Sequence, residues 1–501
     1  MPRGVGIAFV LFCAAVYLWT APGRILFPDD EIVFQTTRAI AERGSLAIAG
    51  IPKRTGELKG RPDGTFGWAP GRDGQRYGFF GHGLALVALP TYAIGEAMAT
   101  RAPEPWRHAI RSDHYMLHQR SQQEDWPRLV VSLTNCWVTP LGAWLFVRWI
   151  VALGFAWRTA VLTGLVAAFG TLAWPYSRTF LSEPLSGATL VGTAWCIAEL
   201  HRRLDDPRRA RGWAAAAGAL AAFAVHVHVL NLVALPCLLG YALVPFVRDR
   251  SLATRHRAAL AIALAIAIAG IVALLLGQWW RFGDPFETGR YDHYSWWIAP
   301  GSGLVALLVA PGRSVLLYSP ALLLALPGVR ALGRRVPAAA WCALAIVVTR
   351  LVVVGVRSDW WGGWAIGPRY LVPVLPFALL PLVCVLERAA GWSRAHVAVL
   401  ATAVLACVAL ELHLALHSIF EWMMHVQATG TPELGYLARS HWHVEARPIG
   451  GFATLPLDTL SRGAALLAQH GHPGPWRMFL AIAAGGALAL VTLVRALVRR
   501  T

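Results

Sequence analysis

The stretch AALAIALAIAIAGIVALLLGQW, residues 258–279, has 22 residues and no charged side chain. An α-helix needs about 20 predominantly apolar residues to cross the hydrocarbon core of a bilayer. Apolar runs of similar length recur from one end of the chain to the other. Of its 501 residues, 56% are hydrophobic and 14% are charged, whereas a soluble domain carries about 25% charged residues. We therefore predict an all-α polytopic membrane protein.

Arginine clusters flank this run and others like it. The formal net charge is +18, and lysine occurs only at Lys53 and Lys59. Loops rich in Lys and Arg stay on the cytoplasmic side, so the clusters indicate the orientation of the chain. They lie at 202–211, 248–257, 330–335, 388–394 and 495–500. Nucleic-acid binding is not predicted, because no basic stripe with interleaved aromatic residues lies outside the apolar runs.

Neighbouring clusters must be separated by an even number of spans, and twelve spans satisfy this rule with both chain ends in the cytoplasm. The spans are expected near residues 5–19, 128–149, 159–176, 182–200, 213–231, 232–247, 258–279, 313–332, 337–356, 370–387, 395–414 and 476–495. Residues 79–99 are also apolar, but a span there would turn every later cluster outward. We therefore predict that they form an interfacial helix on the outer leaflet, within one external loop over 21–127.

The remaining external segments are 177–181, 280–312, 357–369 and 415–475. The chain then divides into a transmembrane module (1–414), a C-terminal external segment (415–475), and a last span with a basic cytoplasmic tail (476–501). All seven cysteines lie singly in apolar runs, which argues against a zinc site or a disulfide framework.

Ionisable residues gather on the predicted external side. Asp29, Asp30 and Glu31 follow the first span, and residues 31–43 read as an amphipathic helix that Gly44 ends. Asp29 or Asp30 stands where an N-cap belongs. Three consecutive carboxylates at a bilayer surface exceed what a cap requires, so one of them is interpreted as catalytic or ligand-binding.

Glu183 stands at the outer end of another span. Because Pro184 follows it, Glu183 can simply open a helix; a site role is the alternative. The loop RSDWWGGWAIGPRY, residues 357–370, contains Arg369 at the outer surface, against the orientation rule. A lipid phosphate would compensate that charge, since a guanidinium matches phosphate well. The Trp and Tyr residues of the loop can also be ordinary interface anchors.

Residues 277–297 mix aromatic rings with Arg281, Asp284, Glu287, Arg290 and Asp292. Aromatic and acidic side chains together suit sugar binding; a solvated interfacial loop is the alternative. Every fourth residue from 413 to 425 is ionisable, and the four are His413, His417, Glu421 and His425. No metal site is predicted from them, because interfacial histidines are usually solvated and no HExxH motif occurs.

In this order, the motifs resemble the polyprenol-phosphate-sugar-dependent glycosyltransferases of the GT-C superfamily. The most similar branch is the bacterial family 39-like group, with aminoarabinose transferases of lipid A and relatives of protein O-mannosyltransferases. The resemblance covers roughly residues 1–415. It rests on Asp30-Glu31 through Gly44, on Glu183 (where many relatives have aspartate), and on four strings: WPYSRTFLSEPL, FGDPFETG, LLYSPALLLALPG and WWGGWAIGPRYLVPVLP.

The resemblance implies a GT-C fold with amphipathic juxtamembrane helices in the first external loop, and one inverting displacement at the sugar anomeric carbon. Asp30 would act as general base, Glu31 or Glu183 would orient the acceptor or the base, and Arg369 would hold the departing phosphate. The predicted substrate-binding residues are Asp29, Arg369, Tyr370, Asp359, Trp364, Asp284, Glu287 and His82. No cofactor is required by the motifs, and a divalent cation is left open.

The expected partners are a polyprenyl-phosphate-linked sugar and a lipid, glycan or protein acceptor, with the site on the periplasmic face of a bacterial inner membrane. One rival is a flippase or transporter of a lipid-linked sugar, which should carry ionisable residues near mid-membrane; few are expected there. Another is an O-antigen-ligase-like transferase, which should have paired external arginines.

Overall fold

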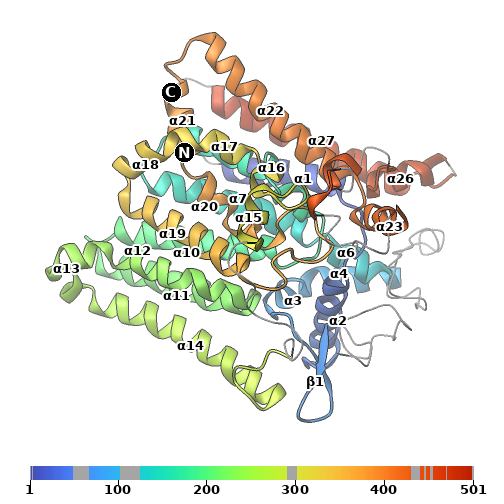
Figure 1. Ribbon diagram of the computed structural model, residues 1–501, viewed down its shortest axis with the longest axis horizontal. Coiled ribbons are helices and arrows are strands. Elements are labelled where there is room, and N and C mark those ends of the chain that lie inside the picture. Colours follow the sequence, from blue (N-terminus) through green and yellow to red (C-terminus); the bar gives the residue numbers. More distant parts are fainter. Residues whose placement is uncertain are drawn as a thin grey trace.

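The computed structural model describes residue 2 and residues 4–48, 67–101, 125–289, 302–429, 441–444, 447–451, 455–469 and 471–498. This part of the chain is almost entirely helical (Figure 1). Its only strands, β1 (Trp68–Pro70) and β2 (Arg76–Gly78), form one antiparallel hairpin in which Ala69 pairs with Tyr77. The all-α prediction is confirmed.

Seven helices of the described chain are long and apolar enough to cross a membrane. They are Trp126–Ala152 (α6, Asp125–Ser132, with α7, Asn135–Ala152), Pro207–Val227 (α11), Val229–Arg248 (η2, Val229–Ala234, with α12, Leu235–Arg248), Arg257–Phe282 (α14), Pro337–Gly355 (α19), Arg394–Leu416 (α22) and Gly474–Val498 (α27). A bent pair, Arg369–Leu379 and Leu382–Ala389, makes an eighth if it counts as one span. The pair comprises η4 (Arg369–Val374), α20 (Leu375–Leu379) and α21 (Leu382–Ala389). All eight fall on predicted spans.

The other four predicted spans have a different form. Helices α1 (Val5–Thr20) and α8 (Trp157–Phe169) are apolar but shorter than the spans above. Helix α10 (Glu183–His201) is buried along almost its whole length, so neighbouring helices and not lipid cover its polar side chains. Around 313–332 the chain is divided into short helices near Pro320 and Pro327, each of which removes a backbone donor. These are α16 (Val315–Tyr318), α17 (Ala321–Ala325), η3 (Leu326–Gly328) and α18 (Val329–Arg335).

The amphipathic helix of the first external loop is α2 (Pro28–Arg43). The Gly44 N–H donates to the Ile40 carbonyl at 3.0 Å, and Gly44 has φ +59°, so the predicted end is confirmed. The predicted aspartate N-cap is wrong, because Phe27 is the N-cap residue. Pro28 is already in the first turn, where proline is favoured, so the aspartates fall inside the helix.

Residues 79–99 do not form one long helix. They contribute to α3 (Gly83–Val87) and α4 (Leu89–Arg101), both too short to cross a membrane. The turn before α3 lies against the end of α11, where a Cβ on Gly81 would be 2.4 Å from the carbonyl oxygen of Val227. A glycine is therefore required there for close packing. The outer-leaflet position of the segment stays a prediction.

The C-terminal external segment is tied to the ends of α1 and α22. It contains α23 (Ile419–Thr429), α25 (Pro448–Gly451) and α26 (Leu460–Gln469). The Leu460 N–H donates to the Ala21 carbonyl at 2.6 Å, and the Asp458 N–H donates to the Leu416 carbonyl at 2.7 Å. The side chain of Arg178 donates to the carbonyls of Thr20, His417 and Asp458.

Predicted external and cytoplasmic elements lie at opposite ends of the molecule. In Figure 1, α2, α4, α23 and α26 are at the right, whereas α13 (Arg250–Arg255) and α18 with their arginines are at the left, as are both chain termini. Helix α10 runs through the middle, packed against α7 and α11. This polarity agrees with the sides assigned from the arginine clusters.

Candidate active site

Four of the predicted site residues meet at the start of α10. Arg369, the first residue of η4, makes two ion pairs: its Nη2 lies 2.7 Å from Asp29 Oδ2, and its Nε lies 2.6 Å from Glu183 Oε1. Glu183 is the first residue of α10, and Asp29 belongs to the first turn of α2. One buried guanidinium therefore joins carboxylates from two distant parts of the chain, and Asp30 lies beside them.

Asp30 differs from its neighbour in lacking a charged hydrogen-bond partner. Its side chain is fully buried. Oδ2 accepts a hydrogen bond from the Phe180 N–H at 3.2 Å, whereas Oδ1 has no partner in the described part of the chain. Burial raises the pKa of Asp30 well above its usual value, and the neighbouring Asp29 carboxylate raises it further. Asp30 is therefore the carboxyl of this cluster best suited to accept a proton near neutral pH.

Glu31 points to a different partner. Its carboxylate takes two hydrogen bonds from Arg128 of α6, at 2.9 and 3.2 Å, and one from Gln35 at 2.8 Å. Both members of this ion pair have 2% of their side-chain surface exposed. The pair joins α2 to α6, so the predicted catalytic role of Glu31 stays a prediction, and in this geometry Glu31 would act by positioning α2.

The loop before Arg369 is shaped by glycines and by a residue that the sequence did not indicate. Gly362, Gly363 and Gly367 have φ values of +70°, +75° and +61°, which L-residues rarely adopt. Arg313 is completely buried and donates to the carbonyls of Gly363, Ala365 and Gly367. Within the described residues, the acceptors that bind Arg313 are backbone carbonyls, and no side-chain pattern in the sequence reveals them.

The other candidates of this loop form a second, adjoining network. Asp359 takes two hydrogen bonds of 2.7 Å from Arg357 and one of 3.4 Å from the Tyr370 hydroxyl. The guanidinium of Arg369 lies 5.5 Å from the centre of the Tyr370 ring, which places Tyr370 between the two networks. The ring of Trp364 packs edge-on against Trp422 of α23 at 5.5 Å, so the C-terminal external segment covers this loop.

Asp284, Glu287 and His82 lie apart from the Arg369 cluster and make no hydrogen bond or ion pair with it within the described residues. Asp284 and Glu287 accept hydrogen bonds from nearby backbone N–H groups just after α14. His82 Nε2 is 3.0 Å from Arg281 Nη1. Burial, helped by Arg281, lowers the pKa of His82 to about 3, so the neutral imidazole accepts this bond. Arg290 and Asp292 lie outside the described residues.

Arg350 and Glu411 are ionisable residues inside spans, where few such residues were expected. Arg350 of α19 is buried and donates to the carbonyls of Leu230 and Tyr370, each at 2.9 Å. It therefore joins the two 3₁₀ segments η2 and η4. Glu411 of α22 is also buried, and neither of its carboxylate oxygens has a partner in the described chain. A lone charged residue in an apolar run was the available signal for both.

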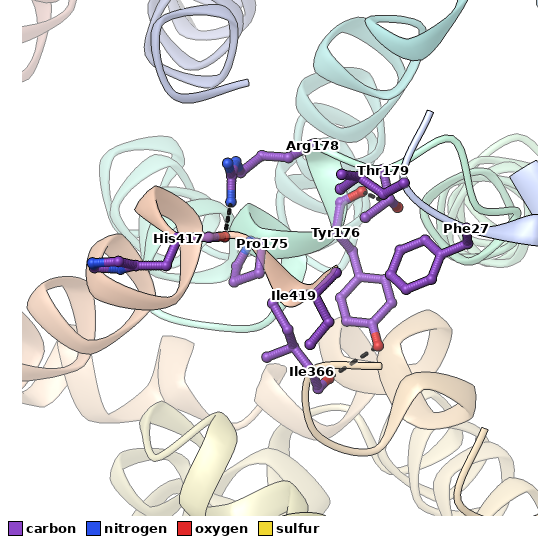
Figure 2. Close-up of a pocket in the computed structure, with 9 residues that line it drawn as sticks. Phe27, Pro175, Tyr176, Arg178, Thr179, Ile366, His417 and Ile419 are labelled. Atoms are coloured by element: carbon purple, nitrogen blue, oxygen red, sulfur yellow. Dashed lines mark hydrogen bonds between the residues drawn. The ribbon is translucent and has the colours of Figure 1, made fainter. Parts of the chain in front are cut away.

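A cavity of about 10 Å³ adjoins the start of α2, with room for about one water molecule (Figure 2). The Tyr176 hydroxyl on its wall donates to the Ile366 carbonyl at 3.0 Å, and Arg178 to the His417 carbonyl at 3.1 Å. Its lining comprises Leu26, Phe27, Pro175, Tyr176, Arg178, Thr179, Ile366, His417 and Ile419.

No three His, Cys, Asp or Glu side chains are grouped to hold a metal ion within the described residues. Among the acidic residues at the site, Asp29 and Glu183 are paired with Arg369.

No protein-family model matches this chain, and no curated protein matches it. Solved structures resemble it in fold. ArnT from Cupriavidus metallidurans bound to undecaprenyl phosphate is 15% identical with a TM-score of 0.49, over 89% of this chain and 74% of that one. The apo form of ArnT is 16% identical with a TM-score of 0.48 over the same shares. The Archaeoglobus fulgidus oligosaccharyltransferase tethered to an acceptor peptide is 11% identical with a TM-score of 0.47, over 86% and 58%.

Proposed function

We propose that this chain is an inverting GT-C-type glycosyltransferase that moves a sugar from a polyprenyl-phosphate carrier to an acceptor on the outer face of the membrane. One observation carries the proposal: a buried arginine is shared by Asp29 and Glu183, beside a carboxyl, Asp30, that has an unpaired oxygen. Such a cluster combines a cation for a phosphate with a base for a hydroxyl.

Arg369 would bind the leaving group. Its two ion pairs use Nε and Nη2, so the guanidinium is already held in one orientation. Negative charge grows on the phosphate as the bond to the sugar breaks, and a fixed guanidinium stabilises that charge without reorganising. Arginine suits this task better than lysine, because its planar donors match two phosphate oxygens at once.

Asp30 would take the proton. The acceptor oxygen forms a bond to the anomeric carbon while the bond from that carbon to the phosphate oxygen breaks. The electron pair of the broken bond leaves with the lipid phosphate, and the hydroxyl proton passes to Asp30. The raised pKa of Asp30 makes it a stronger base than an exposed aspartate. Asp29 and Glu183 would hold Arg369, and Glu31 would fix α2 through Arg128.

The loop 357–370 is proposed to contact the substrates through Asp359, Trp364 and Tyr370. Asp284, Glu287 and His82 would serve a more distant part of the donor or acceptor, since they lie around the end of α14. Whether the donor sugar is a hexose or a pentose, and whether the acceptor is a lipid, glycan or protein, is open in this proposal. The bacterial inner membrane, with the site facing the periplasm, is the proposed location.

The test is a turnover assay in lipid nanodiscs with a panel of radiolabelled polyprenyl-phosphate sugars and a membrane extract as acceptor. Wild type, Asp30→Asn and Asp205→Asn are compared, and donor binding is measured separately. Asp205→Asn makes the same chemical change at an exposed residue of the opposite end. Transfer by wild type and Asp205→Asn, but not by Asp30→Asn that still binds donor, supports the proposal.

Two outcomes contradict it. If wild type consumes no donor but moves labelled lipid between the leaflets of sealed vesicles, as Asp30→Asn also does, the protein is a flippase. If only a lipid-pyrophosphate glycan is consumed, it is an O-antigen-ligase-like transferase.

A further inference from the structure

A second cavity, of about 50 Å³, is lined by Glu183 and lies among α7, α8, α10 and the η4–α20 segment. The residues that line it recur at helical spacing. Thr139, Gly142 and Ala143 lie on one face of α7, and Glu183 and Gly187 lie on one face of α10. The two helices are in direct contact here, since a Cβ on Gly142 would be 3.1 Å from the Cβ of Ala188. The small side chains keep the space open.

Two buried oxygens on this wall have no partner within the described residues: Glu183 Oε2 and Thr139 Oγ1. Glu183 has 1% of its surface exposed and Thr139 has 6%. Buried polar atoms in native proteins are nearly always hydrogen-bonded to protein or to ordered water. The other oxygen of Glu183 is occupied by Arg369, so the carboxylate is satisfied on one side only.

The remaining wall offers nothing that donates a hydrogen bond to Glu183. It consists mostly of glycine, alanine, proline, valine and leucine side chains, and the hydroxyl of Thr171 already donates to the Ala167 carbonyl at 2.7 Å. A water molecule needs about 10–15 Å³ and two or more polar partners. The cavity exceeds that volume, and Glu183, Thr139 and Thr171 supply the partners.

We propose that this cavity is a built water site, in which ordered water joins Glu183 Oε2 to Thr139 Oγ1. Water donates to the carboxylate, so Glu183 is held from both sides and keeps Arg369 oriented. Thr139, which touches neither substrate, is then a positioning residue for the ion pair. The evidence for the water site is the cavity and its two oxygens without partners. Its effect on turnover rests on the proposed transferase function.

The experiment compares Thr139→Val, Thr139→Ser and Thr193→Val with wild type in the full-length protein. Thr193 is a buried threonine on the same helix as Glu183, its hydroxyl already donates to the Thr189 carbonyl at 2.8 Å, and it does not line the cavity. A high-resolution structure in nanodiscs shows whether water occupies the cavity, and steady-state kinetics give kcat and the donor KM separately. Thermal unfolding confirms that each variant is folded.

We expect water density between Thr139 and Glu183 in wild type and Thr139→Ser, and its loss in Thr139→Val. Turnover should fall roughly three- to tenfold in Thr139→Val, because one hydrogen bond is lost. It should return to the wild-type value in Thr139→Ser and be unchanged in Thr193→Val. If Thr139→Val does not fold, Gly187→Ala serves instead. The atoms nearest to the added methyl group belong to Pro373, at 3.4 Å, and the substitution narrows the same cavity without removing a polar group.

The proposal is overturned if the wild-type cavity is dry and takes up xenon, as apolar cavities do. It is also overturned if Thr139→Val keeps the water and the wild-type kinetics. Ordered water in a wild type that transfers no sugar from any donor would leave the water site standing and refute the proposed function.

Discussion

Asp29 and Asp30 are adjacent in sequence, yet their surroundings give them different chemistry. Asp29 is paired with Arg369 and retains 15% side-chain exposure, whereas Asp30 is fully buried with one unpaired oxygen. Burial and the charge of Asp29 both disfavour ionisation of Asp30. A buried carboxyl whose pKa is raised by its surroundings is a recurrent arrangement in acid–base catalysis.

The pH dependence of turnover follows from this difference. A base must be deprotonated to act, and the pKa of Asp30 is raised well above its ordinary value of 3.8. We therefore expect kcat/KM for the donor to rise with pH, with a midpoint well above pH 4. Rates measured from pH 4 to pH 9, alongside donor binding over the same range, test this. A rate already at its plateau at pH 4.5 would rule out Asp30 as the base.

The same shift predicts an effect on stability. A carboxyl with a higher pKa in the folded than in the unfolded chain stabilises the fold at low pH, and this contribution is lost as pH rises through the folded-state pKa. Asp30→Asn should therefore unfold at a higher temperature than wild type at pH 8, with the difference vanishing toward pH 4. Asp29→Asn is the matched control and should unfold at a lower temperature, because it deprives Arg369 of a partner.

Arg369 can be tested by two substitutions. Arg369→Gln leaves Asp29 and Glu183 without their cation in a buried site, and should destabilise the protein by about 3–5 kcal/mol. Arg369→Lys keeps the positive charge but loses the planar guanidinium. It should therefore be more stable than Arg369→Gln, while its kcat falls at least about 100-fold below wild type. Thermal unfolding and steady-state kinetics measure both; wild-type kcat in Arg369→Lys would contradict the phosphate role.

The acidic residues and Arg369 could be predicted because they stand at the external ends of apolar runs, where charge is unexpected. Arg313 could not, since it is bound by backbone carbonyls. Which carbonyls converge on a guanidinium is decided by tertiary packing. Glu31 and Asp30 were equally prominent in sequence, and only the structure shows that Glu31 faces Arg128.

At the scale of elements, local sequence signals predicted most helices and failed where proline or packing intervened. Gly44 ends α2 as expected, but Pro28 moves the N-cap to Phe27. Apolar length located eight spans. Apolar length alone does not identify α10 as a span, because a helix surrounded by protein can carry glutamate and histidine at its ends.

The contact between α2 and α6 can be tested through its ion pair. Glu31→Gln leaves Arg128 as a buried cation without its counter-charge, which should destabilise the protein by about 3–5 kcal/mol. Arg128→Met in the same chain should recover part of that loss, because the pair is replaced and not broken. A double-mutant cycle on thermal unfolding measures the coupling. Additive effects of the two changes would show that the pair does not hold α2 in place.

For the whole molecule, the arginine rule places α13 and the β1–β2 hairpin on opposite sides of the membrane. Gln75→Cys in the hairpin and Thr254→Cys in α13 are both at exposed residues, whereas six of the seven native cysteines are buried. A membrane-impermeant maleimide applied outside spheroplasts should label Gln75→Cys and spare Thr254→Cys until the membrane is permeabilised. If Thr254→Cys is labelled and Gln75→Cys is spared, the topology is the opposite of the predicted one.

The ties around Arg178 have a consequence for biosynthesis. The Trp19 carbonyl at the end of α1 accepts a hydrogen bond from Ser461, which follows it by 442 residues, and α1 packs against α27. Helix α1 therefore meets these partners only after the 442 residues that separate Trp19 from Ser461 have been translated. Until then the side chain of Arg178 lacks the Asp458 carbonyl to which it donates a hydrogen bond. A nascent chain halted before this point would lack the hydrogen bonds that Leu460 and Ser461 make with the end of α1, and proteases should cut it faster than the chain that has them.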